Sequence, residues 1–253
     1  MPPIQALRNT LLLVAIATLS AGSTRAESAE EWAAKALLPF EQAPFQLEFS
    51  ADLTMQQGPT KLRMESQGTL LYRDARHSVT QMQTDVSANG TPSQSSTAHT
   101  IADGEHSWSF SVIKGQPHPQ QILRSRLDDL EARAASEGGV LSVSGDPYSQ
   151  LRAMLPRLAL KVSEGDDVVT LNGTFQGQLP ESLASQLQLF GSSPQVSVTL
   201  DRRTGEPQSM IIGSSGQPTL QVSFRSLKYL DAAATPRSSF AFEPPVGVPI
   251  FSP

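Results

Sequence analysis

Alternating apolar and polar residues form the clearest pattern in the chain. Over residues 45–56 every odd position, from Phe45 to Met55, is apolar and every even position is polar. A turn at Gln57-Gly58-Pro59 interrupts the alternation, which then continues over residues 61–72. Because successive side chains of a strand point to opposite faces, the pattern predicts a long antiparallel hairpin with one apolar face.

Shorter alternations extend the predicted sheet. Residues 76–86 are predicted as a weaker third strand, and residues 88–96, rich in turn-forming residues, as a loop. The Asp103-Gly104 dipeptide is a hairpin signal that separates a short strand at 100–102 from one at 106–112. Further strands are expected at 168–175, 196–200, 210–212 and 220–224.

Other segments show helical spacing instead. A short helix is predicted over 30–38, ended by Pro39 and Pro44. Two amphipathic helices are predicted over 119–135 and 147–160, and a short helix over 180–189. The chain has no internal repeat and no long linker, so the pattern favours one α+β domain in which a helical pair at about 119–160 is inserted into an antiparallel sheet.

The first 26 residues have the features of a secretory signal peptide. Arg8 precedes an apolar run at 11–19, and Thr24 and Ala26 are small residues in front of a cleavage site. The run is too short to span a bilayer, which takes about 20 residues. The sequence therefore predicts cleavage near Ala26, a single exported domain at 27–253, and no transmembrane span in the mature chain.

The amino-acid composition excludes several classes of functional site. The chain contains no cysteine, which excludes thiolate metal sites and thiol catalysis. Its formal net charge is −5 and it has no long basic run, so nucleic-acid binding is not expected. His99, Asp103 and His106 could be imagined as metal ligands around a turn, but we interpret them as surface residues of a hairpin. We therefore expect no catalytic residues, no metal, no cofactor and no enzymatic activity.

A large apolar surface is the remaining candidate for function. The apolar residues of the predicted strands are expected on one side of one sheet, together with adaptable methionines such as Met64, Met82 and Met154. The strand residues concerned are Phe49, Leu53, Leu62, Met64, Leu70, Tyr72, Trp108 and Phe110. They could form a core filled by the helices or line a cavity that accepts a lipid tail, and the periodicity fits both.

The order of these segments resembles the bacterial outer-membrane lipoprotein carrier family, the LolA-like proteins, with its periplasmic sorting and sensor relatives. The matching segments are spread over most of the chain after residue 26. They are Thr54-Met55-Gln56, Gln67-Gly68-Thr69-Leu70-Leu71-Tyr72-Arg73, Asp103 to Phe110, and the ending Phe240-Ala241-Phe242-Glu243-Pro244-Pro245-Val246-Gly247-Val248. The ending is the most specific of these motifs, and the chain looks like a divergent member of the family.

The resemblance implies an unclosed antiparallel β-barrel, or half-barrel, with helices covering a concave apolar face that holds acyl chains. The implied ligand-binding residues are Phe49, Leu62, Met64, Leu70, Tyr72, Trp108 and Phe110, with Leu127 and Leu130 from the helix above them and Arg73 near the mouth. In the family, the arginine that matches Arg73 holds the helical lid and is normally followed by proline, whereas this chain has Asp74.

Two functions are therefore expected. The first is a periplasmic carrier that binds the acyl chains of a lipid or lipoprotein in the half-barrel. The alternative is an envelope sensor or protein-interaction module of the same fold, which has a packed core and binds an envelope protein without transporting a ligand.

Overall fold

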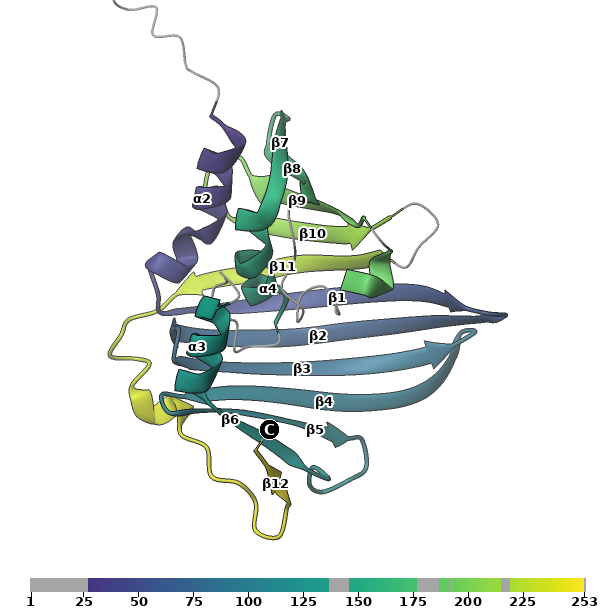
Figure 1. Ribbon diagram of the computed structural model, residues 1–253, viewed down its shortest axis with the longest axis vertical. Helices are drawn as coiled ribbons and strands as arrows, with labels where there is room; N and C mark the ends of the chain where they lie inside the picture. The colour runs from purple at the N-terminus through teal and green to yellow at the C-terminus, as the bar shows by residue number, and fades with distance from the viewer. Residues whose placement is uncertain (1–26, 137–145, 177–186, 192, 215–218, 253) are drawn as a thin grey trace, which may run out of the picture.

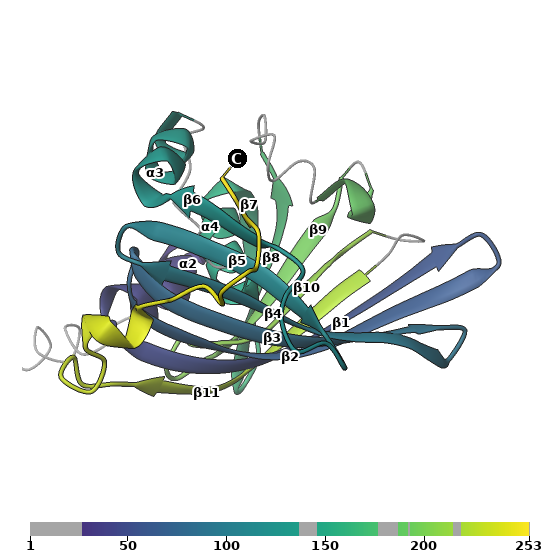
Figure 2. The same cartoon turned by 90° about the horizontal axis from the view of Figure 1, so that it is seen from below.

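The protein is built around one large curved sheet. The computed structural model describes residues 27–136, 146–176, 187–191, 193–214 and 219–252. Within these residues the sheet has twelve strands, in the order β12-β6-β5-β4-β3-β2-β1-β11-β10-β9-β8-β7. Neighbouring strands are antiparallel except β12 and β6. The sheet does not close, because β12 and β7 are its two ends, and the helices lie on its inner side (Figures 1 and 2).

The elements follow one another along the chain as a helix, a run of strands, two helices and a second run of strands. The strands are β1 Phe45–Gln57, β2 Thr60–Asp74, β3 His77–Ala88, β4 Thr91–Asp103, β5 His106–Ile113, β6 Ile122–Arg126, β7 Leu158–Glu164, β8 Val168–Phe175, β9 Gln195–Asp201, β10 Pro207–Gly213, β11 Thr219–Tyr229 and β12 Ile250–Phe251. The helices are α2 Ala29–Glu41, α3 Leu127–Ser136 and α4 Pro147–Met154. Short 3₁₀ turns lie at Leu155–Arg157, Gln188–Phe190 and Arg237–Phe240. The predicted fold class, an unclosed antiparallel half-barrel with helices, is confirmed.

The long hairpin predicted from the alternation is β1–β2. Leu47 pairs with Leu70 and Phe49 with Gly68, and Leu47, Phe49 and Leu70 are buried. Gly68 is required at this point, since a Cβ atom there would lie 2.5 Å from the Phe49 ring. The ring of Phe49 therefore packs flat across the neighbouring strand.

Helix α2 begins as its sequence indicates but ends later. Ser28 accepts a hydrogen bond from the Glu31 backbone N–H, and the Glu31 carboxylate accepts one from Ser28 N–H, which is a complete capping box. The helix was predicted to end at Pro39, yet it continues to Glu41. Proline removes one helical hydrogen bond, but Pro39 is buried, and Gln42 N–H donates to Leu38 O to close the last turn.

The predicted helices in the middle of the chain are partly wrong. Residues 122–126, predicted as helix, form strand β6, and the helix α3 begins only at Leu127. Ile122 is fully buried opposite Phe110 of β5, so pairing and burial at the sheet edge outweigh helical propensity. The second predicted helix ends at Met154, because Pro156 follows and the chain turns into β7 at Leu158.

The segment predicted as a loop at 88–96 is mostly strand β4. Asn89 and Gly90 both have positive φ, 49° and 80°, and they form a two-residue turn that joins β3 to β4. Asn-Gly is the preferred sequence for such a turn, so the sequence itself contains the signal for a hairpin at this point. Residues 1–26 and most of the predicted helix at 180–189 lie outside the described residues.

The core lies between the inner face of the sheet and the helices α2 and α4. Aromatic rings fill its centre: Phe40 of α2 and Tyr148 of α4 stack with centroids 4.7 Å apart, and Phe45 stacks on Tyr72 at 5.0 Å. The Tyr148 hydroxyl donates to Ala36 O at 3.0 Å, which ties the two helices together. Burial of this hydroxyl raises the pKa of Tyr148.

Two adjacent substitutions test which β2 side chains lie on the inner face of the sheet and which lie on the outer face. Leu70 is fully buried on the inner face, whereas Thr69 is exposed on the other face. We expect Leu70→Asp to unfold the protein or to lower its stability by several kcal/mol, because a buried carboxylate has no partner there. We expect Thr69→Asp to change stability by about 0.5 kcal/mol at most. Urea unfolding measures both, and equal losses would contradict the register.

Candidate functional site

Strand register places the predicted ligand-binding residues on two opposite faces of the sheet. Directly paired residues of neighbouring antiparallel strands project to the same face, so a row of pairs can be followed from strand to strand. Phe49, Leu62, Met64, Leu70 and Tyr72 all belong to inner-face rows. We call this the inner face because it packs against the helices α2 and α4.

Trp108 and Phe110 lie on the opposite, outer face, which corrects the expectation of one shared surface. The row that contains Trp108 runs through Ile101 of β4, Val79 of β3 and Leu71 of β2. Alternation shows that a segment is a strand, but it does not show which of the two alternating sets of side chains faces the helices. In β5 this is determined by the register of the β4–β5 hairpin. The inner face of β5 carries Ser107 and Ser109 instead.

The C-terminal segment covers these aromatic residues on the outer face. The Phe242 ring lies 5.4 Å from Trp108 and 5.2 Å from Phe110, and His99 stacks on Phe110 at 4.9 Å. We call Trp108, Phe110, Phe242 and His99 the outer aromatic cluster. Part of the family-like ending therefore packs against the outside of the sheet.

Among the described residues, the helices cover the inner face completely over one part and incompletely over another. Phe49, Leu70 and Tyr72 belong to the buried core. Toward the tip of the β1–β2 hairpin, apolar side chains of the inner face are only partly buried and lie in consecutive paired rows. They are Leu53 and Met55 of β1, Leu62 and Met64 of β2, Val86 of β3 and Leu220 of β11. We call these six residues the apolar strip.

The apolar strip lies far from α3, which was expected to stand over the site. Leu127 is buried and Leu130 is partly buried, but α3 is held at the other end of the strands, beside the β2–β3 turn (Figure 1). There Arg76 forms ion pairs with Asp128 and with Glu131, the latter at 3.2 Å. Of the predicted ligand-binding residues only Leu62 and Met64 thus lie in the strip. Leu53 was expected on the apolar face but not among the binding residues, and Met55, Val86 and Leu220 were missed.

Arg73 makes its hydrogen bonds to a loop. Its guanidinium donates to the carbonyl oxygens of Ala232, at 3.2 Å, and Thr235, both in the loop that follows β11. Its neighbour Asp74 lies 3.9 Å from Arg73 Nε, and its carboxylate accepts hydrogen bonds from His77 Nδ1 at 2.8 Å and from Arg76 N–H. Among the described residues, the hydrogen bonds of Arg73 thus hold the loop that follows β11.

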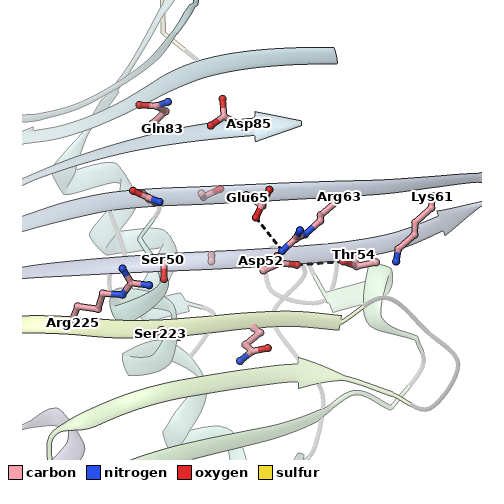
Figure 3. A pocket seen from close by; sticks show the side chains of 14 residues that line it. Ser50, Asp52, Thr54, Lys61, Arg63, Glu65, Gln83, Asp85, Ser223 and Arg225 are labelled. Atoms are coloured by element: carbon pink, nitrogen blue, oxygen red, sulfur yellow. Dashed lines mark hydrogen bonds and ion pairs between the residues drawn. The ribbon is translucent and has the colours of Figure 1, made fainter. Parts of the chain in front are cut away.

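The outer face opposite the core contains a polar groove of about 780 Å³ (Figure 3). Its centre is Arg63, whose guanidinium bridges Asp52 of β1, with Nε at 2.8 Å, and Glu65 at 3.0 Å. The rest of its lining consists mainly of hydroxyl and amide side chains. This groove keeps the outer face of the central strands hydrophilic, in contrast to the apolar strip on the other side of the same strands.

Asp103 organises the β4–β5 turn. Its Oδ1 accepts from Glu105 N–H at 2.9 Å and His106 N–H at 2.7 Å, and its Oδ2 accepts from the Trp108 indole at 2.6 Å. Partial burial acts to raise the pKa of Asp103, but the three hydrogen bonds together outweigh burial and lower the pKa. Asp103 is thus a structural residue of the turn.

Among the residues whose placement the structure describes, no group of three or more His, Asp or Glu side chains is arranged to hold a metal ion. No helix among them is long and apolar enough to cross a membrane.

Comparison with known proteins gives matches to solved structures alone. No protein-family model and no curated protein matches the chain. A LolA superfamily protein from Nitrosomonas europaea matches with 11% identity over 86% of this chain and 99% of that chain, at a TM-score of 0.36. Lipoprotein LppX from Mycobacterium tuberculosis matches with 11% identity over 79% of this chain and 96% of that chain, at a TM-score of 0.43. The complex of MucA and MucB from Pseudomonas aeruginosa matches with 13% identity over 82% of this chain and 60% of that chain, at a TM-score of 0.32.

A LolA superfamily protein is thus among the solved structures to which this chain is similar.

The role of Asp103 can be tested by its pH dependence. We expect Asp103→Asn to lose about 1–3 kcal/mol at pH 7, since the indole N–H loses a charged acceptor. The pKa of Asp103 is lowered in the folded protein, so the carboxylate stabilises the fold above its unfolded pKa of about 3.9. That contribution disappears as the pH falls through the pKa of Asp103 in the folded protein. The difference in unfolding free energy between the parent and Asp103→Asn should therefore narrow below about pH 4.

Urea unfolding at several pH values measures this difference. Asp85→Asn is the matched control, because Asp85 is an exposed carboxylate on β3. A constant difference between parent and Asp103→Asn from pH 7 to pH 3 would contradict the assignment.

Proposed function

We propose that this protein is an exported carrier that binds the acyl chains of a lipid or lipoprotein on the inner face of its open sheet. The apolar strip carries the proposal. Its six side chains are partly exposed, they come from four adjacent strands, and two of them are methionines. Methionine side chains adapt to ligands of variable shape, and a contiguous apolar surface on a soluble domain marks a binding site.

The packing explains where along the sheet a chain would bind. Over Phe45, Leu70 and Tyr72 the inner face is already occupied by α2 and α4. At the hairpin end the strands extend past these helices (Figure 1). An acyl chain that lies along the strip would therefore pack against the side of the existing core, beside the partly buried Leu53 and Leu220.

The free energy available is sufficient for reversible transfer. Each buried methylene contributes about 0.8 kcal/mol, so a 16-carbon chain offers roughly 12 kcal/mol before the costs of association. The apolar strip would bury only one side of the acyl chain, so the free energy gained from burial would be roughly half of this value. Affinity in that range suits a carrier that must release its ligand.

The alternative function is an envelope protein-interaction module without a transported ligand. The filled core beneath α4 favours it, since Tyr148, Leu151 and Met154 are buried against the inner face of the sheet and occupy space that a large cargo would need. In that case the apolar strip would be the surface that meets a protein partner.

A fatty-acid probe whose fluorescence reports solvent polarity distinguishes the two functions. We expect the parent protein to bind the probe and Leu62→Glu or Met64→Glu to weaken binding at least tenfold, because a carboxylate in the strip must be desolvated when the chain enters. Both positions are partly exposed, so we expect the unfolding free energy to fall by about 1 kcal/mol or less.

Gln67→Glu is the matched control. It adds the same charge to the same strand but on the outer face, in the polar groove. We expect this variant to bind the probe as the parent does. Failure of the parent to bind the probe would contradict the carrier function and favour the interaction module, whereas equal losses in all three variants would show that binding does not use the strip.

A further inference from the structure

Exposed apolar side chains concentrate at one edge of the sheet. Among the described residues, seven large hydrophobic side chains are exposed, and four of them lie at the β6–β12 edge. They are Leu123 on β6, Val246 in the turn before β12, and Ile250 and Phe251 on β12, with exposures from 43% to 103%. We call these four residues the edge patch. Such a concentration at the end of a sheet marks an interaction surface.

The backbone of β12 has an unpaired side. Ile122 N–H donates to Pro249 O at 3.0 Å, and Ile250 and Phe251 pair with Ile122 and Leu123 in parallel register. Because backbone groups of successive residues point to opposite sides of a strand, the N–H and C=O of Ile250 point away from β6. β12 is the end of the sheet (Figure 1), so these groups face an open edge.

The charge beside the patch is positive. Arg124 of β6 contacts the Ser252 hydroxyl at 3.2 Å and lies over the Trp108 ring at 5.8 Å, and it has no carboxylate partner among the residues that the structure describes. Arg126, whose side chain is 63% exposed, touches Asp128 at 3.4 Å. This basic strand edge belongs to a chain whose formal net charge is −5.

We propose that the β12 edge binds an extended segment of a partner protein that adds a strand to the sheet, with apolar residues alternating with acidic ones. The apolar residues pack on Phe251 and Leu123, which share one face of the sheet, and the backbone pairs with Ile250. The acidic residues meet Arg124 and Arg126. A second copy of this chain is a poorer occupant, because it would bring the same arginines of two edges together. This surface is separate from the apolar strip.

The probe is a labelled peptide of alternating valine and glutamate, Ac-EVEVEV-amide, whose binding is followed by fluorescence anisotropy. We expect the parent to bind it, and to bind the lysine version Ac-KVKVKV-amide at least tenfold more weakly. We expect Ile250→Pro to weaken binding about threefold to tenfold beyond Ile250→Ala. Proline removes the outward N–H but leaves Phe251 N–H and Pro249 O, which pair with β6.

Leu123→Asp and Ile211→Asp form a matched pair, since the two side chains are 44% and 41% exposed but Ile211 lies on β10, away from the edge. We expect Leu123→Asp to abolish binding of the acidic peptide and Ile211→Asp to leave it unchanged. Thermal unfolding of each variant checks that the fold is retained.

Three results would overturn the proposal. The first is a parent that binds neither peptide, and the second is an Ile250→Pro variant that binds as Ile250→Ala does. The third is a parent that dimerises in sedimentation velocity, with the dimer lost in Ile250→Pro and no peptide bound, because the occupant would then be a second copy. None of these outcomes depends on whether the apolar strip binds acyl chains.

Discussion

The two-residue period of long paired strands is the constraint on which this molecule depends. β1 and β2 pair without a shift from Phe45–Tyr72 to Gln57–Thr60, so the face of every side chain on both strands is fixed by one register. A slip of one residue would exchange the inner and outer faces completely. The aromatic core, the apolar strip and the outer polar groove are all consequences of that single register.

The same constraint explains how much of the structure could be predicted. In the β1–β2 hairpin apolar and polar residues alternate with a period of two, and the apolar residues all fall on one face. Its strands, its turn and its buried residues therefore follow from the sequence. On β5 the period is equally clear, yet Trp108 and Phe110 lie on the outer face. Ser107 and Ser109, which alternate with them, face inward. The strand register and the Phe242 ring that covers the aromatic residues determine this arrangement, and neither is visible in the local sequence.

The helix predicted over residues 122–126 was wrong because a short apolar run fits more than one kind of element. Ile122 and Leu123 fit a helical stripe with Leu127, but two adjacent apolar residues fit an edge strand equally well. The edge strand is formed because Ile122 can be buried against β5, and this contact joins residues that are neighbours in the structure but lie twelve positions apart in sequence. The candidate site was predicted only in part for the same reason. Leu62 and Met64 were identified by alternation, but the position of α4 decides which part of the apolar face is already filled.

The place of β1 in the sheet has a consequence for how the chain folds. β1 is the first strand in sequence, but it lies between β2 and β11, and Phe45 pairs with both Tyr72 and Tyr229. Pairing so distant in sequence makes folding slow, because a long loop must be closed before its contacts form. During synthesis of the chain, β1 can therefore pair with β2 long before β11 has been made. The edge of β1 that β11 later covers stays open until most of the residues have been synthesised, so the central strand is completed late.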